Sequence, residues 1–263
     1  MDEGPEPVVL YERIADHVAL VTLNRPEKRN AVNAELAQAL DAAVKRAEGD
    51  AATRVVVLTS SHERVFCAGA DLAEVAAGGA RTRLSTPDGG FAGFVDHPRR
   101  KPWIAAAQGS IVAGGLEICL ACELVIVAEG SQLGLPEVQR GLIAGAGGLT
   151  RLPRAVPRAV AMEMIATGHP IDAARAYQIG LVNRVVPPGQ LMDSALALAA
   201  EIAGNAPLAV YGALEVAKGA SLLSDEEGRL MTDAALERIR TSNDFREGPR
   251  AFVEKRAPVW TGT

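Results

Sequence analysis

Cysteine, histidine and aromatic residues are scarce in this chain of 263 residues. The three cysteines, Cys67, Cys119 and Cys122, cannot all pair with one another, and their apolar neighbours indicate reduced thiols rather than a disulfide framework. The four histidines are scattered along the chain, so neither residue type shows the spacing of a metal site. The sequence therefore predicts no metal cofactor.

Motifs of nucleotide and acyl-serine chemistry are also missing. The chain has no GxxxxGK[ST] loop and no GxSxG elbow, and the glycines of 145–148 lack the third glycine of a dinucleotide fingerprint. The formal net charge is −5 and no basic tract is interleaved with aromatic residues. We therefore expect no nucleic-acid partner.

Neither export nor membrane insertion is indicated. Residues 1–7 are acidic and contain two prolines, unlike the basic and apolar start of a signal peptide. The longest apolar stretch, 111–128, is interrupted by Glu117 and Glu123. Together with the reduced thiols, this predicts a cytoplasmic protein without a membrane partner.

Strand-like and helix-like segments alternate before residue 148, and helices follow it. Asn33 is placed to cap a helix in which Leu36, Leu40 and Val44 repeat at four-residue spacing. The alternation predicts an α/β fold of stacked turns of sheet and helix rather than a sandwich. The expected strands span 8–10, 18–23, 55–59, 103–107 and 124–128, and the later helices span 158–167, 173–179, 191–205, 208–218 and 225–240.

Two glutamates lie in surroundings that are unusual for surface charge. Glu117 follows Gly114 and Gly115 in an apolar run, and Glu137 follows a proline between apolar residues and the glycine-rich stretch 144–148. A buried carboxylate is costly unless it is paired, hydrogen-bonded or protonated, and this perturbation is what acid–base catalysis uses. A solvent-facing Glu117 and a turn-capping Glu137 are equally compatible with the pattern alone.

Small residues around Gly69 add a second feature. Glycine allows a backbone to turn successive N–H groups toward one point, and the glycines before Glu117 place N–H groups at a helix start, where negative charge is favoured. Two such N–H groups and two carboxylates would form an oxyanion hole with acid–base partners. Cys67, beside this loop, has no histidine placed to activate it and is interpreted as a packed thiol.

These motifs resemble those of the crotonase, or enoyl-CoA hydratase/isomerase, superfamily. The resemblance covers nearly the whole chain, from Leu23-Asn-Arg-Pro-Glu-Lys-Arg-Asn-Ala-Val-Asn33 to Glu247-Gly-Pro-Arg-Ala-Phe-Val-Glu-Lys-Arg256. It implies a spiral of repeated ββα units over residues 1–190. It also implies a C-terminal helical region over 191–263 that forms homotrimers, which commonly pair into hexamers.

The resemblance also implies roles for individual residues. The N–H groups of Ala70 and Gly114 correspond to the oxyanion donors, and Glu117 and Glu137 to the two carboxylates of the true hydratases, whereas isomerases usually keep one. The residues implied to contact the CoA thioester are Lys28, Arg29, Ala31, Ala68, Asp71 and Leu72. Lys255 and Arg256 are further candidates for the CoA phosphates, from this or a neighbouring subunit, although a basic pair is also typical of a solvated surface.

The function implied is hydration of a trans-2-enoyl-CoA to a 3-hydroxyacyl-CoA, with no cofactor beyond the CoA of the substrate. Segments 133–138, 152–154, 182–186 and 247–260 are similar to carnitinyl-CoA dehydratases, so crotonobetainyl-CoA is an alternative substrate. Its trimethylammonium group needs aromatic faces or a carboxylate, for which Phe91, Phe94 and Trp103 are candidates. Isomerisation and a non-enzymatic binding role remain open, and 76–100 is a candidate acyl-chain lid.

Overall fold

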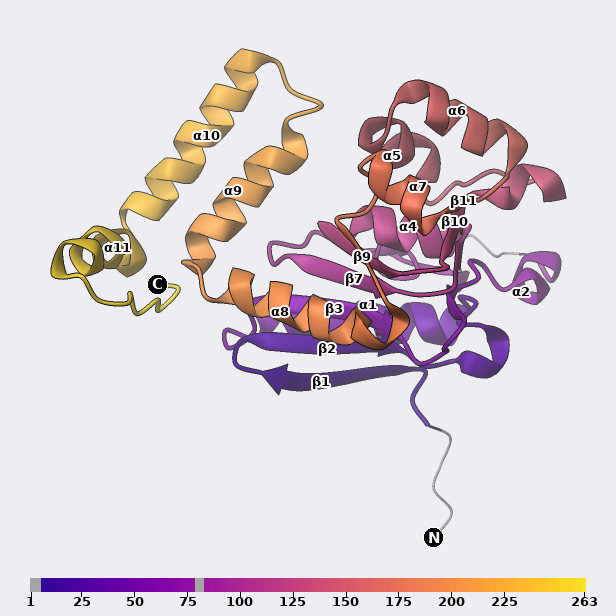
Figure 1. The fold of residues 1–263 in the computed structure, drawn as a ribbon, viewed down its shortest axis with the longest axis horizontal. Helices are drawn as coiled ribbons and strands as arrows, with labels where there is room; N and C mark the ends of the chain where they lie inside the picture. The colour runs from indigo at the N-terminus through magenta and orange to yellow at the C-terminus, as the bar shows by residue number, and fades with distance from the viewer. Residues whose placement is uncertain (1–5, 79–82) are drawn as a thin grey trace, which may run out of the picture.

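Two sheets form the body of the molecule. The computed structural model describes residues 6–78 and 83–263, and Figure 1 shows their arrangement. A six-stranded sheet has the order β1 (Val9–Ala15), β2 (Val18–Leu23), β3 (Val55–Ser60), β7 (Trp103–Ala107), β9 (Leu124–Ala128) and β12 (Arg184–Val186). A four-stranded sheet has the order β11 (Ile171–Asp172), β10 (Gln132–Gly134), β8 (Ser110–Val112) and β4 (Val65–Cys67).

The chain winds between these sheets as a spiral. Strands β3, β7 and β9 are parallel neighbours in the large sheet, and the strand that follows each of them, β4, β8 or β10, joins the small sheet. The three turns continue into α2 (Leu72–Ala76), α4 (Gly114–Ala121) and, after the short 3-10 helix η2 (Pro136–Arg140), α5 (Gly148–Ala155). The predicted α/β spiral of strand–strand–helix turns is therefore confirmed.

Helices bury the two faces of the large sheet. The first helix, α1 (Ala34–Gly49), begins as predicted at Asn33, whose side chain accepts a hydrogen bond from the Leu36 N–H at 2.9 Å. It buries Leu36, Leu40 and Val44 completely, and a fully buried leucine stabilises a fold by about 1.5–3 kcal/mol. Helix α8 (Leu191–Ala203) packs small residues on the opposite face. Sheet strands covered on both faces read as continuous apolar runs, which is why the sequence revealed them.

Two helices escaped the sequence analysis because each contains a proline. These are α5, with Pro153 inside it, and α11 (Asn243–Glu254), with Pro249 inside it. Proline ordinarily ends a helix. The other helices, α6 (Arg158–Thr167), α7 (Ala173–Gln178), α9 (Pro207–Gly219) and α10 (Asp225–Arg240), match the predicted segments closely. Strand β1 continues five residues past the predicted end at Leu10. This part of the strand contains exposed charged residues, so it does not read as an apolar run.

The segment 83–97, called the flap below, is packed rather than loose. Its strands β5 (Ser85–Thr86) and β6 (Gly90–Phe91) form a hairpin, and the Thr86 hydroxyl donates to Asp41 of α1 at 2.8 Å. Gly93 has φ +65°, and a Cβ there would lie 2.2 Å from the Ala37 carbonyl oxygen, so only glycine fits. Residues 79–82 of the predicted lid lie outside the described residues, and the lid function stays a prediction.

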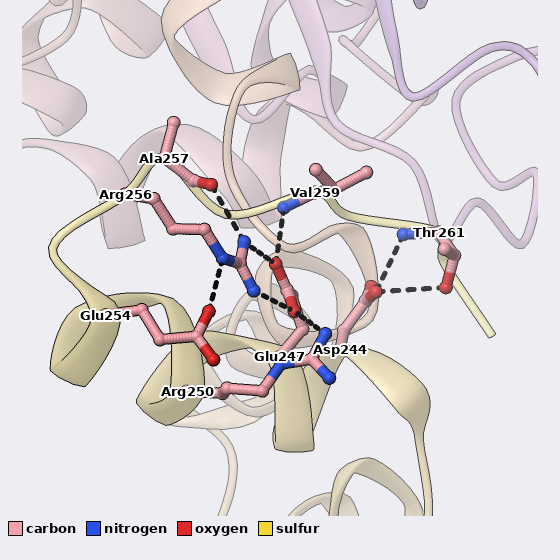
Figure 2. A network of polar contacts seen from close by, with 8 residues as sticks. All are labelled: Asp244, Glu247, Arg250, Glu254, Arg256, Ala257, Val259 and Thr261. Carbon is pink, nitrogen blue, oxygen red and sulfur yellow. Dashed lines mark hydrogen bonds and ion pairs between the residues drawn. The ribbon is translucent and has the colours of Figure 1, made fainter.

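Helices α9, α10 and α11 extend away from the sheets (Figure 1), and the last residues fold back onto α11 (Figure 2). Buried Glu247 accepts hydrogen bonds from the Arg256 and Arg250 guanidiniums and from the Val259 N–H at 2.9 Å. Arg256 beside it holds the pKa of Glu247 well below its usual range. Arg256 is also paired with Glu254, and it follows α11, which Figure 1 shows far from α2. Contact of Lys255 and Arg256 with CoA phosphates, from this or a neighbouring subunit, stays a prediction.

Within the described ranges, no single helix is long and apolar enough to cross a membrane. One bent pair, 188–203 with 207–219, passes on length and composition when the two helices are taken together, with a 106° bend between them.

Candidate active site

The loop after β4 is held by backbone hydrogen bonds that leave one donor free. The Ala68 N–H donates to Arg29, the Val32 N–H to Gly69, and the Asp71 N–H to Val32, at 3.1, 2.8 and 2.9 Å. The N–H of Ala70, between these bonds, has no acceptor among residues 6–78 and 83–263. An unpaired backbone donor beside a cleft is available to a ligand.

Cys67, at the start of this loop, is a packed thiol as predicted. It is fully buried, donates to the Asn30 carbonyl at 3.1 Å and accepts from the Gly69 N–H at 3.4 Å. Burial raises the pKa of the thiol to about 12, so the thiolate needed by a nucleophile is disfavoured.

The start of α4 supplies a second free donor against the first loop. Gly114 is the first residue of the helix, and its N–H has no acceptor in the part of the chain that the structure describes. A Cβ on Gly69, where φ is +90°, would lie 2.9 Å from the Gly114 nitrogen, so the two loops touch only because residue 69 is glycine. Ala113 before it has φ 53° and ψ −130°, a conformation costly for alanine that sets the direction of the next N–H.

Glu117 lies in the first turn of α4 and is 3% exposed. Its Oε1 accepts hydrogen bonds from the N–H groups of Ala146 and Gly148, at 2.7 and 2.8 Å. Gly148 begins α5, so the carboxylate lies at the N-terminus of that helix, where its charge is favoured. Since both bonds go to Oε1, Oε2 stays free of donors from the described residues.

Burial raises the pKa of Glu117 to about 7, an effect that the Gly148 N–H opposes and the nearby charge of Glu137 strengthens. Glu137 lies in η2, and its Oε2 is buried without a hydrogen-bond partner among the described residues. Burial also raises the pKa of Glu137. An unpartnered oxygen favours the protonated form of a carboxyl group, whereas two N–H donors favour the carboxylate. The two carboxyl groups therefore lie in different hydrogen-bonding environments within one site.

A single cleft of about 1170 Å³ unites all of these groups. The four candidate catalytic and oxyanion residues and the six implied contacts of the CoA thioester all line it: Lys28, Arg29, Ala31, Ala68, Ala70, Asp71, Leu72, Gly114, Glu117 and Glu137. Lys28 and Arg29 are exposed, as is Arg140, a third cation on the wall that the sequence analysis did not single out. The charged chains therefore lie toward solvent, and the carboxylates and free N–H groups lie deeper.

The model of the enoyl-CoA hydratase/isomerase family matches residues 13–263. The chain belongs to this family. A carnitinyl-CoA dehydratase from Proteus mirabilis (strain HI4320) is 41% identical over 247 residues, 92% of this chain and 94% of that relative. The crystal structure of an enoyl-CoA hydratase from Mycobacterium tuberculosis H37Rv has a TM-score of 0.92 and 42% identity, covering 98% of this chain and 100% of that one. A carnitinyl-CoA hydratase from Mycobacterium avium has a TM-score of 0.76 and 41% identity, with 98% and 100% covered.

Membership in the enoyl-CoA hydratase/isomerase family confirms the resemblance read from the motifs, and the structural matches confirm the crotonase-type fold. Among residues 6–78 and 83–263, no three His, Cys, Asp or Glu side chains gather where they would hold a metal ion.

Asp71 lines the cleft, but its carboxylate is already engaged. Arg25 donates from Nη1 both to the Asp71 carboxylate at 2.8 Å and to the Ala31 carbonyl at 2.9 Å. This hydrogen bond with Arg25 lowers the pKa of Asp71. Asp71 also caps α2 through the Ala73 N–H. The pair holds the loop of Ala70 in place, and Arg25 could not be recognised from the sequence because its partner is 46 residues away.

Two of the three aromatic candidates for a cationic acyl group are buried elsewhere. Phe94 and Trp103 have no exposed surface, and they stack edge-to-face with centroids 5.0 Å apart. The Arg99 guanidinium covers the Phe94 ring at 3.9 Å. Neither ring reaches the cleft, so the suggestion that they bind a trimethylammonium group is wrong. Phe91 does line the cleft, and it contacts the start of α4.

Replacing Glu117 by glutamine is expected to raise the free energy of unfolding at pH 8 by about 3 kcal/mol and to leave it nearly unchanged at pH 4. The pKa of Glu117 rises from 4.5 to about 7 in the folded protein. The folded state therefore retains a proton that the unfolded state loses, and stability falls as pH rises through this window. Glutamine avoids that loss. Urea unfolding at both pH values measures the effect, with exposed Glu129→Gln as the control; equal stabilities at pH 8 would contradict the burial argument.

Proposed function

We propose that the chain adds water across the 2,3 double bond of a trans-2-enoyl-CoA to give a 3-hydroxyacyl-CoA. The observation that carries this proposal is a pair of carboxyl groups, buried Glu117 and half-buried Glu137, in one cleft with two backbone N–H groups that have no acceptor among the described residues. Addition of water to an enoyl thioester needs a base for the water, an acid for C2 and donors for the thioester oxygen. The cleft supplies one candidate for each task.

The N–H groups of Ala70 and Gly114 would donate to the thioester carbonyl oxygen. As water attacks C3, electron density moves through C2 to this oxygen, and fixed donors stabilise the enolate-like charge without reorganising. The hydrogen bonds on either side of Ala70 and the Arg25–Asp71 pair support such a fixed geometry. Asp71 thereby acts on the loop rather than directly on CoA.

Glu117 would hold the water at its free Oε2 and take one of its protons as the C3–O bond forms. Glu137 would then deliver its proton to C2, which completes the addition. The proton left on Glu117 returns to Glu137 through solvent before the next turnover. Because the charge of Glu137 raises the pKa of Glu117, the two carboxyls are treated as a coupled pair.

The CoA moiety would lie along the outer part of the cleft. Exposed Lys28 and Arg29 offer positive charge to its phosphates, and Ala31, Ala68 and Leu72 offer small or apolar contacts. Arg29 and Asn30 have φ values of 55° and 52°, so the chain turns sharply at this point. No metal or redox cofactor takes part in the proposed reaction.

The wall of the cleft favours an uncharged, apolar acyl group. Apolar side chains dominate it: Val65, Val75, Leu84, Phe91, Val112 and Ile143. The two aspartates of the wall, Asp71 and Asp96, are each paired with an arginine. For a trimethylammonium group the wall offers the ring of Phe91 and the carboxyl groups of Glu117 and Glu137, and both glutamates are needed for the proposed reaction.

Crotonobetainyl-CoA is the second candidate substrate, because a relative with 41% identity over 92% of the chain is a carnitinyl-CoA dehydratase. We also propose assembly as a homotrimer or a hexamer. Large apolar side chains on α10 and α11 support it, with Leu230, Phe252 and Val253 exposed by 54, 85 and 78%.

A substrate panel in isotopically labelled water tests the proposal. Crotonyl-CoA, a long-chain trans-2-enoyl-CoA and crotonobetainyl-CoA are incubated with the protein in H₂¹⁸O and in D₂O. We expect ¹⁸O at C3 and deuterium at C2, with higher kcat/KM for an uncharged substrate than for crotonobetainyl-CoA. Higher kcat/KM for crotonobetainyl-CoA would select the second candidate. Double-bond migration without ¹⁸O would indicate an isomerase, and absence of turnover on all three would reject hydration.

A further inference from the structure

We infer that Arg151 is a positioning residue that joins the flap to the loop holding Glu117, so that the base is oriented only while the flap is packed on the cleft. This inference rests on the proposed role of Glu117. Arg151 does not line the cleft, and it belongs to none of the motifs described in the sequence analysis. Its support comes from bonds that Arg151 makes to two separate segments.

One side of the Arg151 guanidinium holds the loop before α5. Nη1 donates to the Ala146 carbonyl at 3.0 Å, and a Cβ on Gly147 would lie 1.8 Å from the same nitrogen. The guanidinium therefore lies against the bare backbone of Gly147. The residues on either side of Gly147 are Ala146 and Gly148, whose N–H groups bind Oε1 of Glu117.

The other side of the guanidinium holds the flap. Nη2 donates to the Val95 carbonyl at 2.6 Å and to the Asp96 carboxylate at 3.2 Å. Val95 and Asp96 are 56 and 55 positions away from Arg151 along the chain. The five donors of a guanidinium in a fixed plane suit such bridging, which a single ammonium group cannot reproduce.

The flap also contacts the oxyanion side of the cleft. A Cβ on Gly114 would lie 2.5 Å from the ring of Phe91, so the ring packs against the residue whose N–H is a proposed donor. Phe91 and Val95 are joined by the hydrogen bond from the Val95 N–H to the Phe91 carbonyl, at 3.2 Å. The flap thus contacts one donor through Phe91 and, through Arg151, the loop that orients the base.

Charge acts in the same direction as these bonds. Burial is the main cause that raises the pKa of Glu117, and the charge of Glu137 adds to it, whereas the Gly148 and Ala146 N–H groups and, to a smaller extent, the positive charge of Arg151 lower it. Asp96 is the acidic group that directly faces Arg151. Loss of Arg151 removes a positive charge and releases the loop with its N–H donors. Both changes raise the pKa of Glu117, so the carboxylate would form only at higher pH.

The test compares Arg151→Met and Arg151→Lys with the wild type. For Arg151→Met we expect kcat to fall about 10–100-fold from misplacement of the base, and the acidic limb of the kcat–pH profile to move up by about one pH unit. Arg151→Lys keeps the positive charge but cannot make all of the bridging hydrogen bonds. Its acidic limb should therefore lie close to that of the wild type, while its kcat stays reduced. Hydrogen–deuterium exchange at the amides of 146–148 should accelerate in both variants, and this readout needs no turnover.

Arg154→Met is the matched control, because Arg154 is an exposed residue of the same helix with no bond among the described residues. It should leave kcat, the pH profile and exchange unchanged. If Arg151→Met does not fold, Arg151→Lys and Asp96→Asn carry the test. An unshifted acidic limb with unchanged exchange at 146–148 would overturn the inference, even if stability fell. An inactive wild type would instead reject the proposed function, while the exchange result would still decide whether Arg151 holds the loop.

Discussion

Glu117→Gln is expected to lower the rate of hydration of a trans-2-enoyl-CoA by about 10²–10⁴-fold in a protein that stays folded. Glutamine fits the same space and its Oε1 can still accept from the N–H groups of Ala146 and Gly148, at 2.7 and 2.8 Å in the wild type. What it lacks is the basicity to take a proton from water. Steady-state kinetics with crotonyl-CoA measure the loss of rate, and a circular dichroism spectrum checks that the variant is folded.

The same substitution at Glu137 should cost a similar factor, because the amide cannot deliver a proton to C2. The control is Glu129→Gln, which changes an exposed glutamate and should leave turnover unaffected. Near-normal kcat in folded Glu117→Gln or Glu137→Gln would remove that residue from the mechanism. In the wild type, kcat/KM should fall as pH drops through about 7, where Glu117 takes up its proton.

Ala70→Pro should abolish most of the activity by deleting one oxyanion donor, a loss of about 10²–10³ in kcat for other enzymes. Proline removes the N–H of residue 70 without requiring a new side-chain contact at the carboxylates. That N–H makes no internal hydrogen bond in the described part of the chain, whereas those of Ala68 and Asp71 do. The fold therefore loses no observed bond, and kinetics on crotonyl-CoA measure the effect of the donor.

Ala73→Val is the control for this experiment, since Ala73 is an exposed residue of α2 with no proposed role as a donor. It should cost little activity. Gly114→Val should weaken both catalysis and thioester binding, because the Cβ meets the Phe91 ring at 2.5 Å and displaces the flap. Full activity in well-folded Ala70→Pro would mean that the free N–H is not an oxyanion donor.

The residues of the candidate site could be recognised from the sequence where a local pattern determines the structure. Gly69 and Gly114 are required by a positive φ or a close approach, and such needs leave a visible signature in a short stretch of chain. Glu117 was conspicuous because its neighbours are apolar. For the same reason the buried strands β7 and β9 were found with their correct ends.

The sequence could not reveal contacts between distant segments. Arg25 with Asp71, and Arg151 with Val95, join residues 46 and 56 positions apart, and an arginine in either place reads as ordinary surface charge. Phe94 and Trp103 failed as ligand contacts for a related reason. An aromatic side chain can line a cleft or pack in the core, and Phe94 and Trp103 pack in the core against Arg99. Only the three-dimensional fold decides which of these alternatives a side chain adopts.

The spiral orders the appearance of the candidate site residues during synthesis and folding. Ala70 follows β4, Gly114 and Glu117 follow β8, and Glu137 follows β10, so each successive turn contributes a different part of the site. A nascent chain that has completed two turns would have both proposed oxyanion donors and the proposed base, but neither the proposed acid nor the loop that holds Glu117. On the proposed mechanism, full hydratase activity would therefore report completion of the third turn.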